Sequence, residues 1–281
     1  MSPPAGASRS PSYVAQLLAI SRRAALQLVR QPSHSRRAEA ARQLARHSLL
    51  LAATGAALII LLMIALDGPE IELMPPRGTP TLWPVRILTE FGKDAYVLLS
   101  LGGALVLVAL AAAALHGNTR ALLLGIGTRL QFMFFAVLVS VLIGDLLKWV
   151  VGRGRPFVGG KANPFNFVPF NGTEAYYSLP SGHAVTAFAL AFAVGALWPR
   201  VRTAMYLYAV AIALTRLVLL SHHPSDVVAG ALVGIVGAMA VQYWFAARRL
   251  GFAIRAGGEI VPLPDPVSRG FKRVARAAPA P

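Results

Sequence analysis

Six long apolar segments constrain the fold of this 281-residue chain more than any other feature. Hydrophobic residues make up 56% of the chain and charged residues only 14%, and the mean hydropathy of +0.60 is too high for an ordinary soluble domain. Each segment is long enough, or nearly so, to cross about 30 Å of hydrocarbon as a helix. Because a helix satisfies its own backbone hydrogen bonds in lipid, the pattern predicts an all-α integral membrane six-helix bundle. The predicted spans are residues 48–66, 94–115, 122–147, 183–199, 203–221 and 226–246.

The distribution of charge predicts how these spans are oriented. The net charge is +16, and the whole excess lies at 1–47, 116–130, 199–202 and 247–281, while the other segments are balanced between acids and bases. Basic residues gathered in alternate connections follow the positive-inside rule. We therefore expect a multi-pass protein of a bacterial-type inner membrane with both termini cytoplasmic. No aromatic-studded basic module accompanies the charge, which argues against nucleic acid as a partner.

The two ends of the chain differ in composition from its centre. Residues 1–47 predict a basic cytoplasmic tail, residues 48–246 the six-helix transmembrane domain, and residues 247–281 a second basic cytoplasmic tail. Within the first tail, residues 14–30 suit an amphipathic helix lying on an anionic leaflet, and a partly ordered topology signal is an equally good interpretation. The first 47 residues lack the uninterrupted apolar core of a cleavable signal peptide. The chain has no cysteine, which excludes disulfides and thiol chemistry.

Three short polar blocks stand at the ends of the apolar spans. If the spans run alternately outward and inward, as the charge bias indicates, all three blocks meet at the same outer surface of the membrane. The sequence thus predicts one site assembled from the periplasmic ends of four helices. The blocks are Lys148-x6-Arg155-Pro156, Pro180-Ser181-Gly182-His183 and Arg216-x5-His222-x3-Asp226.

The cations of these blocks suit a tetrahedral oxyanion. Arginine donates two parallel hydrogen bonds and lysine acts as a mobile point charge, so Lys148, Arg155 and Arg216 predict a phosphate-binding cradle. An arginine at the bilayer centre costs about 2.5–3.5 kcal/mol, and less near the interface. Taken alone, Arg216 would be a snorkelling anchor. The histidine and aspartate that follow it at fixed spacing favour a role in the site.

The second block predicts the start of a helix. Ser181 is a natural N-cap, the free backbone N–H groups of the first turn attract anions, and Gly182 allows a close approach of the backbone. Taken alone the block would be weak evidence, because Ser-Gly is common in loops and His183 would more often be a structural polar residue.

The third block places a carboxylate near an imidazole. His222 and Asp226 are four residues apart, and Pro224 opens the last helix between them. We expect Asp226 to accept a hydrogen bond from one ring nitrogen of His222 and to leave the other nitrogen free to attack, as covalent catalysis requires. His223 lacks this spacing and is predicted to be a neighbour of the nucleophile.

Together the blocks resemble the signature of the type 2 phosphatidic acid phosphatase family, which is related to the vanadium haloperoxidases. The pattern is matched throughout except at Thr215, where the family usually has serine, and the six-helix layout resembles the membrane form of the family. The resemblance covers about residues 48–246. It implies a two-step hydrolysis without metal or other cofactor. His222 would form a phosphohistidine, Asp226 would orient it, and His183 would act first as general acid and then as general base.

The resemblance also assigns the phosphate-binding groups. Outside this set, Asp145, one helical turn before Lys148, is a candidate to orient that lysine, and Arg153 is an auxiliary candidate; interfacial charges are the alternative interpretation of both. The aromatic residues of the loop 157–179 either frame the substrate entrance or serve as simple interfacial anchors. The phosphate-binding residues that the resemblance implies are Lys148, Arg155, Ser181, Gly182 and Arg216.

These observations predict a membrane phosphatase that removes phosphate from a lipid phosphate or lipid pyrophosphate at the periplasmic face. Undecaprenyl pyrophosphate, phosphatidic acid, phosphatidylglycerol phosphate and lipid A all stay open as substrates, and the oligomeric state stays open as well. A lipid phosphotransferase with a polyprenyl diphosphate donor would use the same site. A haloperoxidase would need vanadate, and relatives with that chemistry are typically soluble. A non-catalytic transporter or scaffold predicts instead that the motif residues are dispensable.

Overall fold

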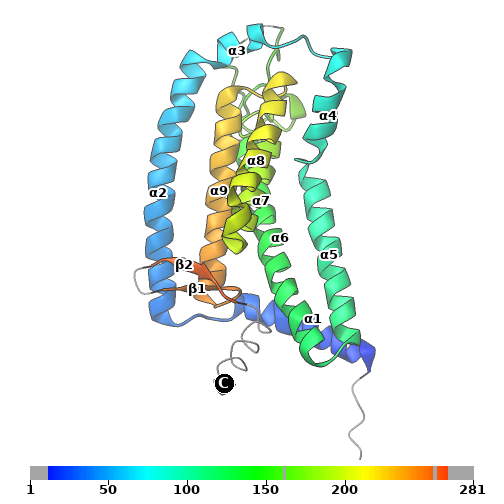
Figure 1. Ribbon diagram of the computed structural model, residues 1–281. Helices are drawn as coiled ribbons and strands as arrows, with labels where there is room; N and C mark the ends of the chain where they lie inside the picture. The colour runs from blue at the N-terminus through cyan, green and yellow to red at the C-terminus, as the bar shows by residue number, and fades with distance from the viewer. Residues whose placement is uncertain (1–11, 161–162, 256–257, 265–281) are drawn as a thin grey trace, which may run out of the picture.

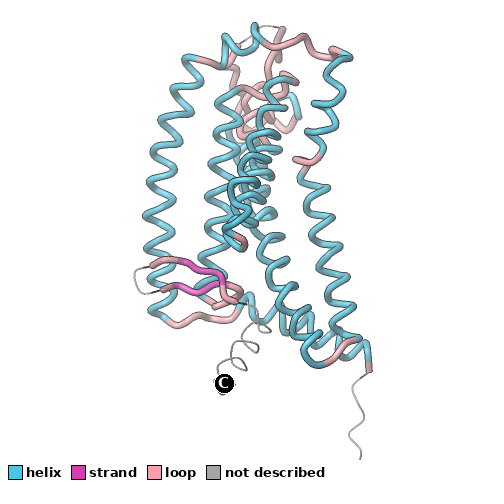
Figure 2. The backbone as a smooth tube through the Cα atoms, viewed as in Figure 1, coloured by secondary structure: helices cyan, strands magenta, loops and turns pink. Residues whose placement is uncertain are grey.

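Long helices packed side by side make up most of the chain, as the computed structural model shows for the described residues 12–160, 163–255 and 258–264 (Figure 1). Every predicted span falls on one of these helices, and Figure 2 shows how little of the described backbone is strand. The predicted all-α membrane bundle is therefore confirmed. The long helices are α2 (His34–Ala65), α5 (Asp94–Ala114), α6 (Gly117–Val151), α7 (Gly182–Leu197), α8 (Arg202–Val218) and α9 (Pro224–Ala247).

Shorter elements close the two ends of the bundle. At the lower end in Figure 1, α1 crosses beneath the long helices and an antiparallel hairpin pairs Ala253 with Val261. At the upper end, α3, α4 and the three-residue 3₁₀ turns η1 and η2 lie in the connections between the long helices, while the 3₁₀ turn η3 joins α7 to α8 at the opposite end of these two helices. These elements are α1 (Tyr13–Val29), α3 (Asp67–Leu73), η1 (Pro80–Leu82), α4 (Trp83–Glu90), η2 (Glu174–Tyr176), η3 (Pro199–Val201), β1 (Phe252–Ile254) and β2 (Ile260–Pro262).

Five of the described helical segments are long and apolar enough to cross a membrane, judged by length and composition, and α7 is shorter. Its 16 residues extend about 24 Å at 1.5 Å per residue. Ten of them are buried, mostly alanines, since α7 packs against α6, α8 and α9 in the centre of the bundle. Because its neighbours cover it, α7 does not have to match the full thickness of the hydrocarbon.

Glycines of α9 bring its backbone close to α7. A methyl group at Gly230 would overlap the carbonyl of Ser181, and one at Gly234 would overlap the carbonyl of Val185. Small residues permit this spacing between membrane helices. The contact fixes the first turn of α7 beside the first two turns of α9, which is where two of the three polar blocks lie.

Two element boundaries bear on the predicted domains. The helix α2 begins at His34, inside the predicted tail 1–47, and the hairpin of β1 and β2 lies in the predicted tail 247–281. Phe252 of this hairpin is fully buried, with its ring 4.7 Å from that of Phe132 on α6. The division of the chain at these boundaries stays a prediction. Residues 265–281 of the predicted C-terminal tail lie outside the described residues.

Candidate active site

The three polar blocks come together at one end of the bundle, the upper end in Figure 1. Lys148 lies in the last turn of α6 and Arg216 in the last turn of α8, while α7 begins at Gly182. The second and third blocks are in direct contact, because the backbone N–H of Ser181 donates to the carbonyl of Asp226 at 2.9 Å. The alternating directions of the helices thus assemble residues from distant parts of the sequence.

The carboxylate of Asp226 is fully buried in the first turn of α9. It accepts hydrogen bonds from Nη1 of Arg153 at 2.6 Å, from Oγ of Ser178 at 2.6 Å and from the backbone N–H of His223 at 2.9 Å. Such a set of donors satisfies the oxygens of a buried carboxylate. Asp226 therefore serves as a fixed anionic anchor between α9 and the loop that precedes α7.

Arg153 is the side chain that connects this anchor to the rest of the fold. Its guanidinium is fully buried and also donates to Oδ2 of Asp67 at 2.7 Å and to Oγ of Ser225 at 2.6 Å, while the backbone carbonyl of Arg153 accepts from the N–H of Ser178. Asp67 in turn accepts from the backbone N–H of Ser225 at 3.0 Å. Sequence reasoning left Arg153 outside the core of the site and did not find Asp67, Ser178 or Ser225. The position of Arg153, two residues before Arg155, was the one available signal.

His222 is oriented by a different group from the one predicted. Its Nδ1 lies 2.8 Å from the backbone carbonyl of Ser178, whereas Oδ2 of Asp226 is 3.9 Å away, which is beyond hydrogen-bonding distance. Because a carbonyl only accepts, Nδ1 carries the proton and Nε2 carries the lone pair. Asp226 acts on this arrangement through the hydroxyl of Ser178. The predicted direct hydrogen bond from His222 to Asp226 is therefore wrong. The tautomer expected from it still holds, because the carbonyl of Ser178 takes the place of the carboxylate as acceptor.

The surroundings of His222 favour its neutral form. Burial is the main cause that lowers the pKa of His222 well below its ordinary value, and the positive charges of Arg216 and Arg155 lower it further. The hydrogen bond to Ser178 opposes this shift and does not cancel it. A neutral imidazole with a free Nε2 is the nucleophilic form of histidine.

Arg216 is held by a residue that the sequence did not single out. Its Nη1 donates to Oγ1 of Thr89, at 2.8 Å, and Thr89 is buried near the end of α4. The hydroxyl of Thr215, which replaces the family's usual serine, lies 3.0 Å from the same Oγ1 and donates to the carbonyl of Ile212 at 2.6 Å. The short helix α4 thus contributes to the site by fixing the guanidinium of Arg216.

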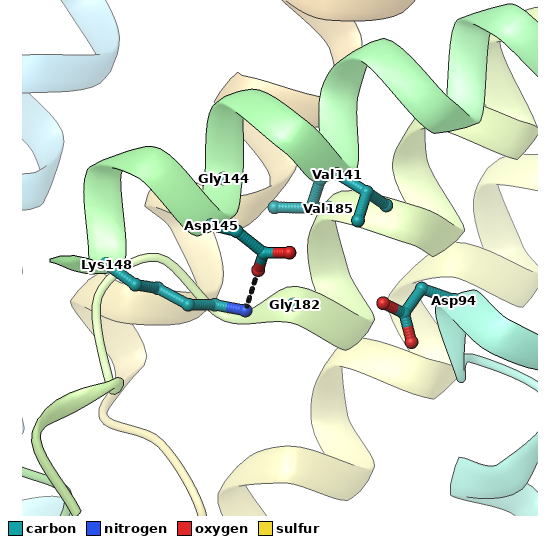
Figure 3. Close-up of a pocket in the computed structure, with 7 residues that line it drawn as sticks. All are labelled: Asp94, Val141, Gly144, Asp145, Lys148, Gly182 and Val185. Atoms are coloured by element: carbon teal, nitrogen blue, oxygen red, sulfur yellow. Dashed lines mark hydrogen bonds and ion pairs between the residues drawn. The ribbon is translucent and has the colours of Figure 1, made fainter. Parts of the chain in front are cut away.

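Lys148 extends over the start of α7, as Figure 3 shows. Its Nζ donates to Oδ1 of Asp145 at 2.8 Å, so Asp145 orients this lysine as the sequence suggested. A methyl group at Gly182 would lie 3.0 Å from Nζ, which explains why a glycine suits this position. Asp94 of α5 lies across a cavity of about 10 Å³ beside these residues, large enough for about one water molecule.

Among the described residues, four side chains assigned to phosphate chemistry have a buried polar atom without a hydrogen-bond partner. These atoms are Nε of Arg155, Oγ of Ser181, Nε2 of His183 and Nε of Arg216. Ser181 is the N-cap residue of α7, as predicted, but its hydroxyl makes no capping hydrogen bond. An unpaired buried polar group costs about 1–3 kcal/mol, so such a concentration is typical of a site that binds a polar ligand. The other residues with such atoms are Glu70, Thr186, His223 and Arg248.

Comparison with known proteins places the chain in a family. Residues 129–250 match the PAP2 superfamily, and this range contains all three polar blocks. A lipid A 1-phosphatase from Rhizobium johnstonii is 32% identical over 205 residues, which cover 71% of this chain and 82% of that relative. A lipid A 1-phosphatase from Rhizobium etli is 40% identical over 103 residues, covering 37% of this chain and 44% of that relative. No solved structure is a significant match to the chain.

The chain therefore belongs to the PAP2 superfamily, the type 2 phosphatidic acid phosphatases whose signature the three blocks resemble. With its apolar helices, it is a membrane phosphatase that acts on lipid phosphate.

Proposed function

We propose that this protein removes the phosphate group at position 1 of lipid A, by way of a phosphohistidine, on the membrane side opposite its N-terminus. Both relatives named above are lipid A 1-phosphatases, and the first is similar over most of both chains. The observation that carries the mechanism is the orientation of His222, whose Nδ1 lies 2.8 Å from the carbonyl of Ser178, beside four buried polar atoms that have no hydrogen-bond partner among the described residues.

In the first step, Nε2 of His222 attacks phosphorus and a phosphorus–nitrogen bond forms. The bond between phosphorus and the leaving oxygen breaks, and Nε2 of His183 gives its proton to that oxygen. In the second step His183 takes a proton from water, the water oxygen attacks phosphorus, and the phosphorus–nitrogen bond breaks to release inorganic phosphate. His183 is then protonated again and His222 is neutral, so both residues return to their starting states.

The cations and the helix start stabilise the charge that develops on the phosphoryl oxygens. Arg155 and Arg216 contribute guanidinium groups, Lys148 contributes an ammonium, and the Ser181 hydroxyl and the N–H of Gly182 add hydrogen-bond donors. Preorganised donors of this kind supply the largest electrostatic contribution in most phosphoryl and acyl transfers. Arg153 and Asp226 are positioning residues here, because they hold Ser178 and through it His222.

The orientation in the membrane rests on the position of the basic residues. The arginine-rich segment 22–46, which runs from α1 into the start of α2, lies with the hairpin at the end of the bundle away from the site. Basic segments of membrane proteins stay on the cytoplasmic side. This arrangement supports a periplasmic site. Because the chain has no cysteine, single cysteines can report on it directly. We expect Gly172→Cys, in the exposed loop near the site, to react with an impermeant maleimide in intact spheroplasts, and His116→Cys at the other end to react only after lysis. The reverse pattern would contradict the orientation.

The substrate is tested by phosphate release from purified protein in detergent with lipid A, phosphatidic acid, phosphatidylglycerol phosphate and undecaprenyl pyrophosphate. We expect the highest kcat/KM with lipid A and release of its 1-phosphate. Equal or faster release from another lipid would contradict the substrate assignment. Transfer of the phosphate group to an acceptor lipid, in place of its release as free phosphate, would identify a phosphotransferase.

The intermediate is tested by rapid quenching at alkaline pH with labelled lipid A. We expect protein-bound label with the unaltered enzyme and none with His222→Ala, whose rate falls by several orders of magnitude. His223→Ala is the matched control, since it removes the adjacent imidazole and leaves the backbone hydrogen bond to Asp226 in place. Label on the His222→Ala protein would exclude His222 as the nucleophile.

A further inference from the structure

A large cavity lies between α1, α5 and α6, toward the end of the bundle opposite the candidate active site. Its volume is about 1050 Å³, at the upper end of the range of small-molecule sites. Leu105 and Val108 of α5 and Phe134 of α6 are among the apolar residues that line it. Nothing in the proposed phosphatase mechanism uses this cavity.

The charged residues of the cavity wall have one sign. Arg23 of α1 and Arg120 of α6 line it, and its described lining residues include no aspartate or glutamate. Nη1 of Arg120 donates to Oε1 of Gln16 at 3.1 Å, which holds this guanidinium where α1 meets α6. The cavity thus combines an apolar interior with two cations on its wall.

The helix α1 is fixed near both of its ends. At its start, the hydroxyl of Tyr13 donates to the carbonyl of Leu110 on α5 at 3.1 Å. At its end, the indole N–H of Trp244 on α9 donates to the carbonyl of Leu28 at 3.1 Å. The helix α1 is therefore held across the end of the bundle at two points, and the cavity lies between the middle of α1 and the helices α5 and α6.

The outward side of α1 suits the surface of a bilayer. Val14, Leu18 and Val29 are each more than 60% exposed, and the neighbouring Arg22 is exposed as well. Exposed apolar side chains beside arginines are the pattern of a helix at the level of lipid headgroups. A lipid of the adjacent leaflet can then place its acyl chains in the cavity and its headgroup at the level of α1.

We propose that this cavity is a binding site for an anionic phospholipid of the leaflet next to α1. The acyl chains lie between α5 and α6, and the phosphate is paired with Arg23 and Arg120. Charge complementarity selects the headgroup, because the described residues that line the wall include two arginines and no acid. A zwitterionic phospholipid with the same chains gains less from these two cations.

Native mass spectrometry of the full-length protein tests the headgroup. The protein is released from nanodiscs that contain equal amounts of dioleoyl-phosphatidylglycerol and dioleoyl-phosphatidylcholine. We expect one phosphatidylglycerol retained per protein, in preference to phosphatidylcholine. Each of Arg23→Gln and Arg120→Gln is expected to weaken this preference about fivefold. Arg22→Gln is the matched control, because Arg22 is exposed on the same helix and does not line the cavity.

A second pair of variants tests the acyl chains. Gly127→Leu adds a side chain to the cavity wall, and the only described neighbour of its first carbon is Val108, at 3.4 Å. We expect it to lower the retention of both lipids. Gly103→Leu is the control, since Gly103 lies on α5 outside the cavity and the added carbon meets nothing within 4 Å.

Several outcomes of the lipid measurements would overturn the proposal. They are equal retention of the two lipids, no retained lipid, and retention that Gly127→Leu leaves unchanged. A dimer without lipid in the same spectra would also overturn it, because a second copy would then occupy the cavity. Phosphate release from lipid A by the same preparations reports on the active site separately, since none of these variants touches it.

Discussion

The two ends of this molecule both carry arginines, and Arg153 at the site end differs sharply from the exposed arginines at the other end. At the site end, the fully buried Arg153 is paired with Asp67 and Asp226 through bonds of 2.6–2.7 Å. At the other end, arginines such as Arg22 and Arg46 are exposed. The first arrangement depends on the position of each atom, whereas the second depends on little more than the sign of the charge. Substitutions at the two ends should therefore have very different effects.

A second contrast lies within the site itself. Arg153 and Arg155 are two residues apart, yet Arg153 is bonded to carboxylates while Nε of Arg155 has no partner among the described residues. Arg153 therefore stabilises the fold, whereas Arg155 is available to bind a ligand.

The largest effect on stability is expected for Arg153→Ala. It leaves two buried carboxylates without their cation, and breaking a buried ion pair in this way costs about 3–5 kcal/mol. Thermal and denaturant unfolding in detergent measure the loss. Arg46→Ala at the other end is the control and should stay within about 0.5 kcal/mol of the unaltered protein. Equal stability of the two variants would show that the Arg153 network contributes nothing.

Arg155→Ala should act on the rate with little effect on stability. Loss of one preorganised donor to the phosphoryl oxygens lowers kcat/KM by about 10²–10³. Steady-state phosphate release and thermal unfolding, measured on the same preparation, separate the two effects. Arg155→Lys should recover only part of the rate, because lysine cannot donate two parallel hydrogen bonds. A large loss of stability in Arg155→Ala would remove the distinction between the two arginines.

Thr89→Val tests whether α4 serves the site through Arg216. The substitution keeps the shape of the side chain but removes the oxygen that accepts from Nη1 of Arg216. We expect about a tenfold fall in kcat/KM, an effect smaller than the loss of a donor that contacts the phosphate. Thr186→Val is the matched control on α7, since the buried hydroxyl of Thr186 has no partner among the described residues and its removal should be neutral or stabilising. Equal activity of both variants would exclude a role for Thr89.

The smallest effect concerns Glu70 on α3, beside the buried carboxylates. Burial, with the nearby charges of Asp67 and Asp226, raises the pKa of Glu70 from 4.5 to about 7. The folded protein then holds a proton that the unfolded chain has lost, so this contribution to stability is present below pH 4.5 and disappears as the pH rises toward 7. After allowance for solvent screening we expect about 1–2 kcal/mol. Glu70→Gln should remove this part of the pH dependence of unfolding. An unchanged profile would contradict the raised pKa.

The sequence predicted the bundle because each span has to satisfy a local requirement. A run of apolar residues long enough for the bilayer becomes a helix whatever its neighbours are, and the predicted spans accordingly fall on α2 and α5–α9. Their ends were less accurate. The helix α2 begins 14 residues before the predicted span, which missed its first turns because the arginines of residues 34–47 lower the hydropathy there.

The support of the site was not predictable in the same way. Asp67 is 86 residues from Arg153 in the sequence, and Thr89 is 127 residues from Arg216. Neither belongs to a motif, and each would pass for an ordinary residue of a loop or a helix end. Ser178 was equally hidden, because the atom that orients His222 is its backbone carbonyl, and every residue has one.

The sequence alone determined the all-α membrane class and the end of the bundle where the three blocks meet, and it predicted which residues carry the chemistry. These follow from residue types, spacing and the alternation of spans, all of which are properties of the chain itself. Only the tertiary structure decided that Ser178 replaces Asp226 as the hydrogen-bond acceptor of His222, that Arg153 is part of the fold, and that Thr89 holds Arg216. The reason is physical. A hydrogen bond depends on tenths of an ångström, and these distances are set by the packing of segments that lie far apart in the sequence.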